Sequence, residues 1–308
     1  MGEIKPPILV ITGPTACGKS ALALDIAREC GGEIISADSM QLYRGLDIGT
    51  AKPDAAEQAL VRHHLINVFD FSKRLDVYTF VELAEAAVKD IHSRGKLPII
   101  AGGTGLYIKS FLYGLDPLPG DTGLRAVLER EFNGDEGFER LKDIMSKVAP
   151  DDFERWHQHQ RKLLRAYEVF KLTGSSISKL QTIKEPVMRY NATVWNLVRN
   201  REELKLRIAQ RTDAMLKTGW IEEARNAVAH GLLNSPTAWQ AIGYASIAKH
   251  LNGEIDYETM KAQIITLTWQ LARRQITWFK HQHPEAKHIQ FPCDHCQLIE
   301  RVKTTLAV

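Results

Sequence analysis

The chain has 308 residues, of which 44% are apolar and 25% charged, and a chain of this length folds into about two domains of ordinary size. This composition is typical of a folded globular protein and excludes a disordered or fibrous one. No stretch approaches the roughly 18 uncharged apolar residues that a membrane span needs, so we expect a soluble, untargeted chain with no membrane association. Four cysteines in so long a chain do not make a disulfide framework, which favours the reducing cytoplasm.

The net charge is only +3, but the charges are sorted along the chain. Residues 1–150 carry −4, residues 151–215 carry +5, residues 216–260 carry −2 and residues 261–308 carry +4. Two basic stretches thus flank an acidic one. They could be solvated helix faces or a surface that binds a polyanion, and charge alone does not choose between the two.

The first half of the chain alternates short buried strands with helices. Apolar, β-branched runs predict the strands, while helical spacing of apolar residues together with caps predicts the helices. In chain order these are a strand over 7–11, a helix over 20–29, a strand over 33–36, a helix over 77–92 with Asp76 as its N-cap, and a strand over 97–101. This order predicts an α/β fold with a parallel sheet flanked by helices.

From about residue 120 to 190 the pattern changes to charged helical segments, clearest over 129–147 and 153–171. A strand pattern returns at 193–198, and it is followed by helical patterns over 202–217, 221–230, 239–251 and 257–280. The helical stretch therefore interrupts the α/β domain. We expect a discontinuous P-loop catalytic domain over 1–118 and 191–308, and an inserted all-helical domain over 119–190.

A phosphate-binding loop is predicted directly after the first strand. The residues match the pattern G-x-x-x-x-G-K-[ST], with a strand before them and a helix after them: Gly13, Pro14, Thr15, Ala16, Cys17, Gly18, Lys19 and Ser20. Such a loop directs backbone N–H groups and a helix N-terminus at a diphosphate, Lys19 adds a charge, and Ser20 can ligate Mg²⁺.

The loop does not specify which phosphates it holds. ATP or GTP is the default ligand, so a small-molecule kinase or NTPase is one interpretation. Such an enzyme normally places an Asp at the end of a second buried strand, whereas the strand over 97–101 continues into Gly102, Gly103 and Thr104. This omission weakens the NTPase interpretation, and a diphosphate ester other than a nucleotide would satisfy the same N–H donors.

Polar residues follow the second and third strands. In an open parallel sheet the carboxyl ends of the strands line one crevice, so we expect Asp38, Thr104 and the phosphate loop around a single cavity. Asp38 could be a turn or capping residue, or it could accept a proton from an attacking nucleophile. Gln41 carries the donor and acceptor that suit an adenine edge.

These residues carry a resemblance that spans nearly the whole chain. The sequence resembles the tRNA dimethylallyltransferases, also called tRNA isopentenyltransferases, more closely than the plant enzymes that prenylate free adenine nucleotides. The matching segments are Gly13–Ser20, Asp38–Gly45, Asp47–Pro53, His63–Ile66, Gly102–Tyr107 and Arg273–Phe279.

The resemblance implies transfer of a prenyl group from dimethylallyl diphosphate to N6 of adenosine 37 in the tRNA anticodon loop, with Mg²⁺ as cofactor. Asp38 would be the base, Lys19 and the loop would stabilise the departing diphosphate, and Thr104 would orient the reactants. By matching positions, Arg201 and Arg207 would reach the diphosphate, although they could instead form a solvated helix face. The target base would have to leave the anticodon-loop stack.

The resemblance also implies which residues contact the tRNA anticodon stem-loop. They are Asp38, Ser39, Met40, Gln41, Thr104, Arg125, Arg161, Lys162, Leu163, Leu164 and Arg165. The sequence departs from the family at Gln158, His159 and Lys162, where Asn-Asp and Arg are usual, and at Ser246 and Trp269, where Glu and Arg are usual. An Arg-to-Lys change removes a planar fork of donors. A tRNA-binding relative with impaired catalysis is therefore another hypothesis.

Two other groups invite a metal interpretation. Cys293, His295 and Cys296 have zinc-ligating side chains, but we favour a tail with incidental thiols, because the cysteines and histidines do not have the spacing of the zinc finger in eukaryotic relatives. His63 and His64 are interpreted as packed structure rather than a metal pair. We expect a monomer.

Overall fold

The computed structural model describes residues 6–182, 187–283 and 285–306. The chain divides into two compact units, one with the bounds Met1–Tyr113 and Met188–Val308 and one with the bounds Gly114–Val187. The sequence had suggested 119 and 190 as the limits of the helical insertion. No helix of the described residues combines the length and the apolar character needed to cross a membrane.

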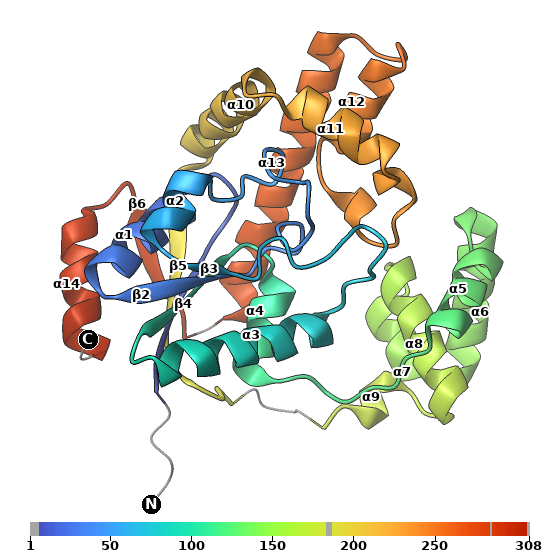
Figure 1. Cartoon of the computed structure of the whole chain (residues 1–308). Coiled ribbons are helices and arrows are strands. Elements are labelled where there is room, and N and C mark those ends of the chain that lie inside the picture. The colour runs from blue at the N-terminus through green and yellow to red at the C-terminus, as the bar shows by residue number, and fades with distance from the viewer. Residues whose placement is uncertain (1–5, 183–186, 284, 307–308) are drawn as a thin grey trace, which may run out of the picture. The chain divides into compact units, whose positions relative to one another are not determined.

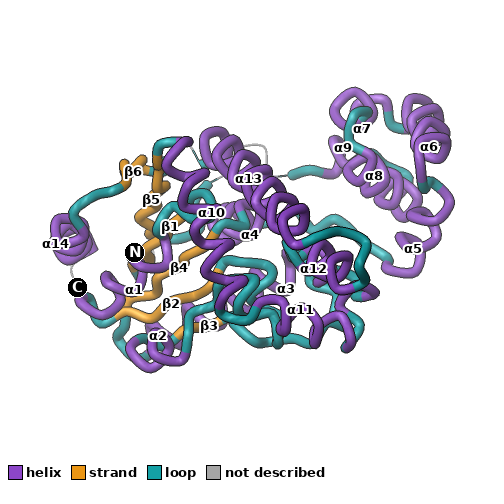
Figure 2. Tube along the Cα trace, turned by 90° about the horizontal axis from the view of Figure 1, so that it is seen from above, coloured by secondary structure: helices purple, strands orange, loops and turns teal. Residues whose placement is uncertain are grey.

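The first unit contains a six-stranded sheet with the order β3-β2-β4-β1-β5-β6, in which every neighbouring pair is parallel. Figure 2 shows the strands following one another in this order. Leu9 of the central strand pairs with Ile99 on one side and Thr193 on the other. The predicted parallel α/β fold is confirmed. The strands are β1 (Pro7–Thr12), β2 (Gly32–Ser36), β3 (His63–His64), β4 (Leu97–Gly102), β5 (Asn191–Arg199) and β6 (Lys287–Phe291).

Two cores cover the two faces of this sheet because alternate residues of a strand point in opposite directions. Ile8 and Val10 belong to one core, whereas Leu9 and Ile11 belong to the other. The first core includes residues of α3 (Val77–Ser93), α4 (Gly105–Tyr113), α11 (Trp220–Ala229) and α12 (Tyr244–Leu251). The second includes residues of α1 (Lys19–Glu29), α10 (Arg201–Lys217) and α14 (His295–Leu306). The long helix α13 (Tyr257–Gln282) contributes to both, and Figure 1 shows it crossing beside the sheet.

Short elements complete the first unit. They are α2 (Ala55–Leu60), with a capping box between Asp54 and Glu57, and the 3-10 turns η1 (Leu232–Asn234) and η2 (Ala238–Gln240). Asp76 caps α3 as expected, its side chain accepting the backbone N–H of Thr79 at 2.8 Å.

The second unit is helical and has its own apolar core, which includes Leu128, Leu141 and Leu163. Its helices are α5 (Thr122–Glu131), α6 (Gly134–Val148), α7 (Pro150–Trp156), α8 (Gln160–Thr173) and α9 (Ile177–Leu180). The helices expected over 129–147 and 153–171 are each wrong in extent. The first is divided at Phe132–Gly134, where Gly134 has a φ of +71°, and the second is divided between Trp156 and Gln160.

Candidate active site

The glycine-rich loop joins the buried strand β1 to α1, which places it at the carboxyl edge of the sheet. Its glycines are required by close packing. A Cβ on Gly13 (φ +144°) would lie 2.7 Å from the Leu197 carbonyl, and a Cβ on Gly18 (φ +112°) would lie 3.1 Å from the Phe291 ring. The loop therefore keeps a backbone shape that larger residues could not adopt.

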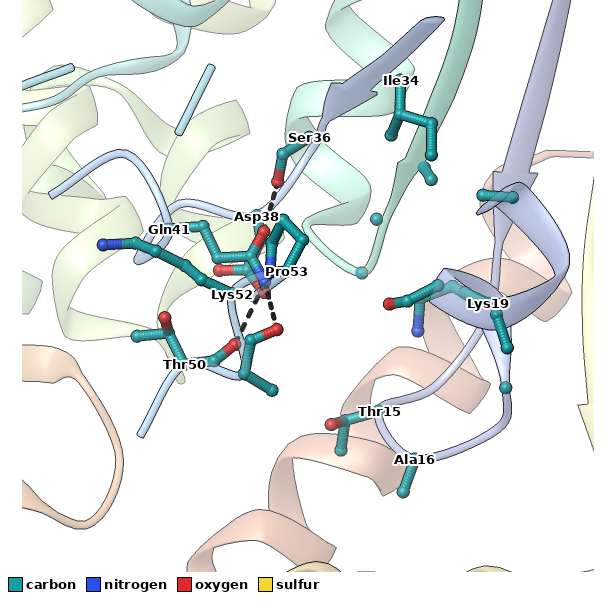
Figure 3. A pocket seen from close by; sticks show the side chains of 18 of the residues that line it. Thr15, Ala16, Lys19, Ile34, Ser36, Asp38, Gln41, Thr50, Lys52 and Pro53 are labelled. Atoms are coloured by element: carbon teal, nitrogen blue, oxygen red, sulfur yellow. Dashed lines mark hydrogen bonds between the residues drawn. The ribbon is translucent and has the colours of Figure 1, made fainter. Parts of the chain in front are cut away.

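A cavity of about 440 Å³ opens beside this loop, and all the residues that line it belong to the first unit. Thr15, Ala16 and Lys19 face Asp38 and Gln41 across it (Figure 3). Four cationic side chains line the cavity, those of Lys19, Lys52, Arg207 and Arg211, and so do the carboxylates of Asp38 and Glu57. Other lining residues are Ser36, Thr50, Gly103 and Gln275. The expected meeting of the loop and Asp38 at one cavity is thus what the structure has.

Cations converge on the loop. Lys19 Nζ donates to the carbonyls of Gly13 and Pro14, at 3.0 and 2.7 Å. Arg207 Nε donates to the Ala16 carbonyl at 2.8 Å, and Arg199 Nε donates to that of Cys17 at 3.2 Å. The guanidinium groups therefore lie against the loop and add to its positive potential, which an anion would need.

Arg211 lines the cavity beside these cations. Burial lowers the pKa of Arg211, while the charge of Asp38 acts in the opposite sense. Its one hydrogen bond within the described part of the chain is a long one, from Nη1 to Thr15 Oγ1 at 3.4 Å. A guanidinium with five donors and so few partners is suited to bind an anion in the cavity.

Arg201 does not take part in this arrangement. It is exposed at the first position of α10 and does not line the cavity. Arg207 and Arg211 are four residues apart and share a helix face, whereas Arg201 lies six residues before Arg207 and points elsewhere. The structure therefore replaces the expected pair of Arg201 and Arg207 by Arg207 and Arg211.

The opposite wall holds Asp38 and Gln41 after the end of β2. Asp38 Oδ1 accepts the backbone N–H of Met40 at 2.9 Å, and Oδ2 has no hydrogen-bond partner in the described ranges. Gln41 Oε1 accepts from Ser36 Oγ at 2.7 Å, and Gln41 Nε2 donates to the carbonyls of Thr50 and Ala51. One carboxylate oxygen is thus available toward the cavity.

Thr104 and Gln275 connect the strand ends around the cavity. Thr104 Oγ1 accepts the N–H of Ser39 at 3.1 Å and thereby holds the loop after β2, although Thr104 is not among the residues that line the cavity. Gln275, on α13, accepts the N–H of Thr15 at 2.8 Å and donates to the carbonyl of Gly103 at 2.9 Å. Its amide thereby ties the phosphate loop to the end of β4.

Not every predicted residue of the loops faces the cavity. Thr15, Ala16, Gly18, Lys19 and Ser20 line it, whereas Gly13, Pro14 and Cys17 are buried behind them. Ser39 and Met40 also lie outside its lining, and Met40 packs against the first core. Ser20 stands at the start of α1 with an exposed side chain, and its hydroxyl is a hard oxygen donor of the kind Mg²⁺ prefers.

The six residues predicted to contact tRNA in the second unit differ in accessibility. Arg161 and Lys162 are exposed on α8, Leu164 is half-buried, and Leu163 is fully buried in the helical core, so the Leu163 side chain is not available to RNA. Arg125 and Arg165 both form ion pairs with buried Glu168. Burial acts to raise the pKa of Glu168, but hydrogen bonds from these arginines and from the Asp121 N–H have the larger effect. The pKa of Glu168 is therefore below its usual value.

Groups that had invited a metal interpretation have ordinary partners. His63 Nδ1 contacts the Val61 carbonyl, and His64 pairs with buried Glu33 at 2.7 Å. Glu33, His64 and Asp90 lie close enough together to hold a cation, but Arg94 binds both carboxylates and occupies the cluster with its own charge.

Cys293 lies between β6 and α14, and Cys296 lies in the first turn of α14. His295 Nδ1 pairs with Asp25 of α1 at 2.6 Å, Cys293 is half-buried and Cys296 is exposed. Burial raises the pKa of the Cys293 thiol.

Comparison with known proteins decides the family. Residues 41–282 match the family described as IPP transferase. The chain belongs to the IPP transferase family. It is 42% identical over 295 residues to tRNA dimethylallyltransferase 1 of Trichlorobacter lovleyi, covering 94% of this chain and 95% of the relative. It is 39% identical over 308 residues to tRNA dimethylallyltransferase 1 of Citrifermentans bemidjiense, covering 99% of each. As a member of this family, the chain is a prenyltransferase enzyme.

Solved structures agree with this assignment. The crystal structure of a tRNA delta(2)-isopentenylpyrophosphate transferase from Staphylococcus epidermidis has a TM-score of 0.71 and 32% identity, over 98% of this chain and 99% of that one. A eukaryotic dimethylallyltransferase acting on tRNA has a TM-score of 0.78 and 26% identity, over 92% of this chain and 74% of that one.

Three residues of the site were missed by sequence reasoning. Arg211 could have been found from its i, i+4 spacing to Arg207 on a helical pattern. Gln275 lies within the terminal motif that carried the resemblance, but its contact with Thr15 spans 260 residues. Lys52 lines the cavity with a nearly buried side chain and bonds Asp47 and Asn67 at 2.6 Å each, which no local pattern indicates.

Proposed function

We propose that this prenyltransferase transfers a dimethylallyl group from dimethylallyl diphosphate to N6 of adenosine 37 in a tRNA anticodon loop. One observation carries the proposal: a single cavity of about 440 Å³ has a cationic phosphate-binding wall that faces a wall with the Asp38 carboxylate. The names of the relatives, tRNA dimethylallyltransferases, supply the substrate class.

The diphosphate is placed at the glycine-rich loop. The N–H groups at the start of α1, Lys19 and the guanidinium groups of Arg207 and Arg211 surround that wall. As the C1–O bond of the donor breaks, negative charge grows on the departing diphosphate, and donors already held in position stabilise it. Lys19 would exchange its two bonds to loop carbonyls for bonds to phosphate oxygens.

The attacking group is placed at Asp38. The lone pair of an exocyclic adenine amine is delocalised, so N6 is a weak nucleophile until its proton is attracted by an acceptor. Asp38 Oδ1 is fixed by the Met40 N–H, which leaves Oδ2 to accept that proton as the N6–C1 bond forms. The electron pair of the broken C1–O bond leaves with the diphosphate.

Mg²⁺ is the cofactor that we propose for the loop. Ser20 would hold it together with diphosphate oxygens, because its hydroxyl lines the cavity at the start of α1. When bound, the ion would neutralise part of the charge on the diphosphate.

The second unit offers a basic helix for the RNA. Arg161 and Lys162 are exposed at the start of α8 and are available to phosphate groups, whereas Arg125 and Arg165 are held by Glu168. Contacts of this kind position the anticodon stem-loop and carry no base specificity of their own. We further propose that the enzyme acts as a monomer in the cytoplasm.

The test incubates the protein with unmodified tRNA, Mg²⁺ and labelled dimethylallyl diphosphate, followed by digestion and identification of nucleosides. We expect the label in N6-modified adenosine. Bound but unlabelled tRNA would instead indicate a tRNA-binding relative with impaired catalysis. That hypothesis comes from the departures from the family pattern at Gln158, His159, Lys162, Ser246 and Trp269. Consumption of ATP in place of the prenyl donor would indicate a kinase or NTPase.

A further inference from the structure

Glu223, on α11, holds a loop from outside the cavity. Its carboxylate accepts four hydrogen bonds, from the backbone N–H groups of Asp47, Ile48 and Gly49 at 2.8, 2.7 and 2.9 Å and from the hydroxyl of Tyr244 at 2.6 Å. Glu223 itself does not line the cavity. Three successive N–H groups on one carboxylate fix the conformation of the loop over residues 47–49.

Packing holds the same loop against α11. A Cβ on Gly49 would lie 2.1 Å from Trp220 Nε1 and 2.6 Å from the Tyr244 hydroxyl, so only glycine permits this approach. On its other side, Lys52 Nζ binds the Asp47 carboxylate at 2.6 Å. The loop is therefore anchored at both ends, and its next residues reach the cavity.

The anchored loop sets the orientation of the Gln41 amide. The carbonyls of Thr50 and Ala51 accept from Gln41 Nε2 at 3.1 and 3.0 Å, and Ser36 Oγ donates to Gln41 Oε1 at 2.7 Å (Figure 3). An amide nitrogen has two protons and both are directed at carbonyls, whereas the amide oxygen keeps a second lone pair. Gln41 is therefore restricted to accepting a further hydrogen bond.

We propose that Glu223 is a positioning residue that acts through the loop over residues 47–51 and keeps Gln41 as an acceptor, thereby favouring a 6-amino purine over a 6-oxo purine. The inference rests on the proposed function. A 6-amino group donates to the Gln41 oxygen, while a 6-oxo group would place one lone pair against another. Release of the loop would let the amide turn over and present its N–H groups instead.

The test compares Glu223→Gln with the matched control Glu222→Gln, because Glu222 is the exposed neighbour on the same helix and pairs only with Arg225 among the described residues. Two anticodon stem-loop RNAs are used, with adenosine or inosine at the target position. The preference for the 6-amino purine is the inhibition constant of the inosine RNA divided by the KM of the adenosine RNA. The KM of dimethylallyl diphosphate is measured in parallel.

We expect Glu223→Gln to reduce the preference for the adenosine RNA about tenfold, the effect of losing one good hydrogen bond. The donor KM should stay unchanged, Glu223→Asp should recover part of the preference, and Glu222→Gln should behave as wild type. An unchanged preference in Glu223→Gln, whatever its thermal stability, would overturn the inference. A wild-type protein that prenylates no adenosine RNA would instead refute the proposed function.

Discussion

Gln275 offers a sharp test of how the phosphate loop is held. The substitution Gln275→Met keeps the length of the side chain and removes both hydrogen bonds, the one from the Thr15 N–H and the one to the Gly103 carbonyl. Each such bond contributes about 1 kcal/mol net, so the two together amount to about 2 kcal/mol. If this free energy orders the loop for its ligand, the KM of dimethylallyl diphosphate rises about 30-fold.

The assay is steady-state prenyl transfer with the donor and the tRNA varied separately. We expect the tRNA KM to change much less than the donor KM, because Gln275 contacts the loop and not Asp38 or Gln41. Gln270→Met is the matched control, since Gln270 is exposed on the same helix. The reasoning is refuted if the donor KM of Gln275→Met equals that of the control while only the melting temperature falls.

Three further predictions concern single residues. Asp38→Asn should lower kcat about 10²- to 10⁴-fold, the usual contribution of a general base, while filter binding shows that tRNA is still bound; full turnover would exclude Asp38 as the base. Arg211→Gln should raise the donor KM at least tenfold, because a desolvated charge-assisted contact is lost; a donor KM within twofold of wild type would rule out that contact. Burial lowers the pKa of His283 to about 4, below the value of about 6.5 in an unfolded chain, so its contribution to stability is complete above pH 6.5 and is lost as the pH falls toward 4. Urea unfolding should show that wild type loses about 2 kcal/mol more than His283→Phe between pH 8 and pH 5; equal losses would contradict this.

The pH window of the last prediction separates His283 from the buried carboxylate of Glu33. Hydrogen bonds from Arg94, Lys96 and His64 hold the pKa of Glu33 well below its usual range, despite the opposing effect of burial. Because this folded pKa is depressed, the stabilising contribution of Glu33 is present above about pH 4.5 and is lost only below it. Glu33 therefore does not contribute to the change in stability between pH 8 and pH 5. Burial also lowers the pKa of His63, but His63 is present in both proteins, so the comparison with His283→Phe isolates the contribution of His283.

The parts of the fold that local patterns determine could be predicted from the sequence. β1, β2, β4 and β5 are short runs of buried apolar residues next to turn signals, and the glycine-rich loop between β1 and α1 has a pattern of its own. β3 could not be predicted, because it has only two residues and exists through its pairing with β2. β6 is short and half-exposed at the sheet edge, where alternation is weak.

The candidate site was predictable to the same extent. Lys19, Asp38 and Gln41 follow strands directly, so their meeting at the sheet edge follows from topology. Arg201 was misplaced because the rotation of α10 about its own axis decides which of its arginines face the phosphate loop. The local sequence does not determine that rotation. The roles of Gln275 and Glu223 depend on contacts across 260 and about 175 residues of chain, which only the folded structure brings together.

The most direct measurement is a crystal structure of the protein with a non-reactive analogue of dimethylallyl diphosphate. We predict the diphosphate at the backbone N–H groups of Thr15–Ser20, within contact of Lys19 and Arg211, and the allylic carbon directed at Asp38. An empty loop in that crystal, together with a nucleoside triphosphate bound there when ATP is supplied, would contradict the account.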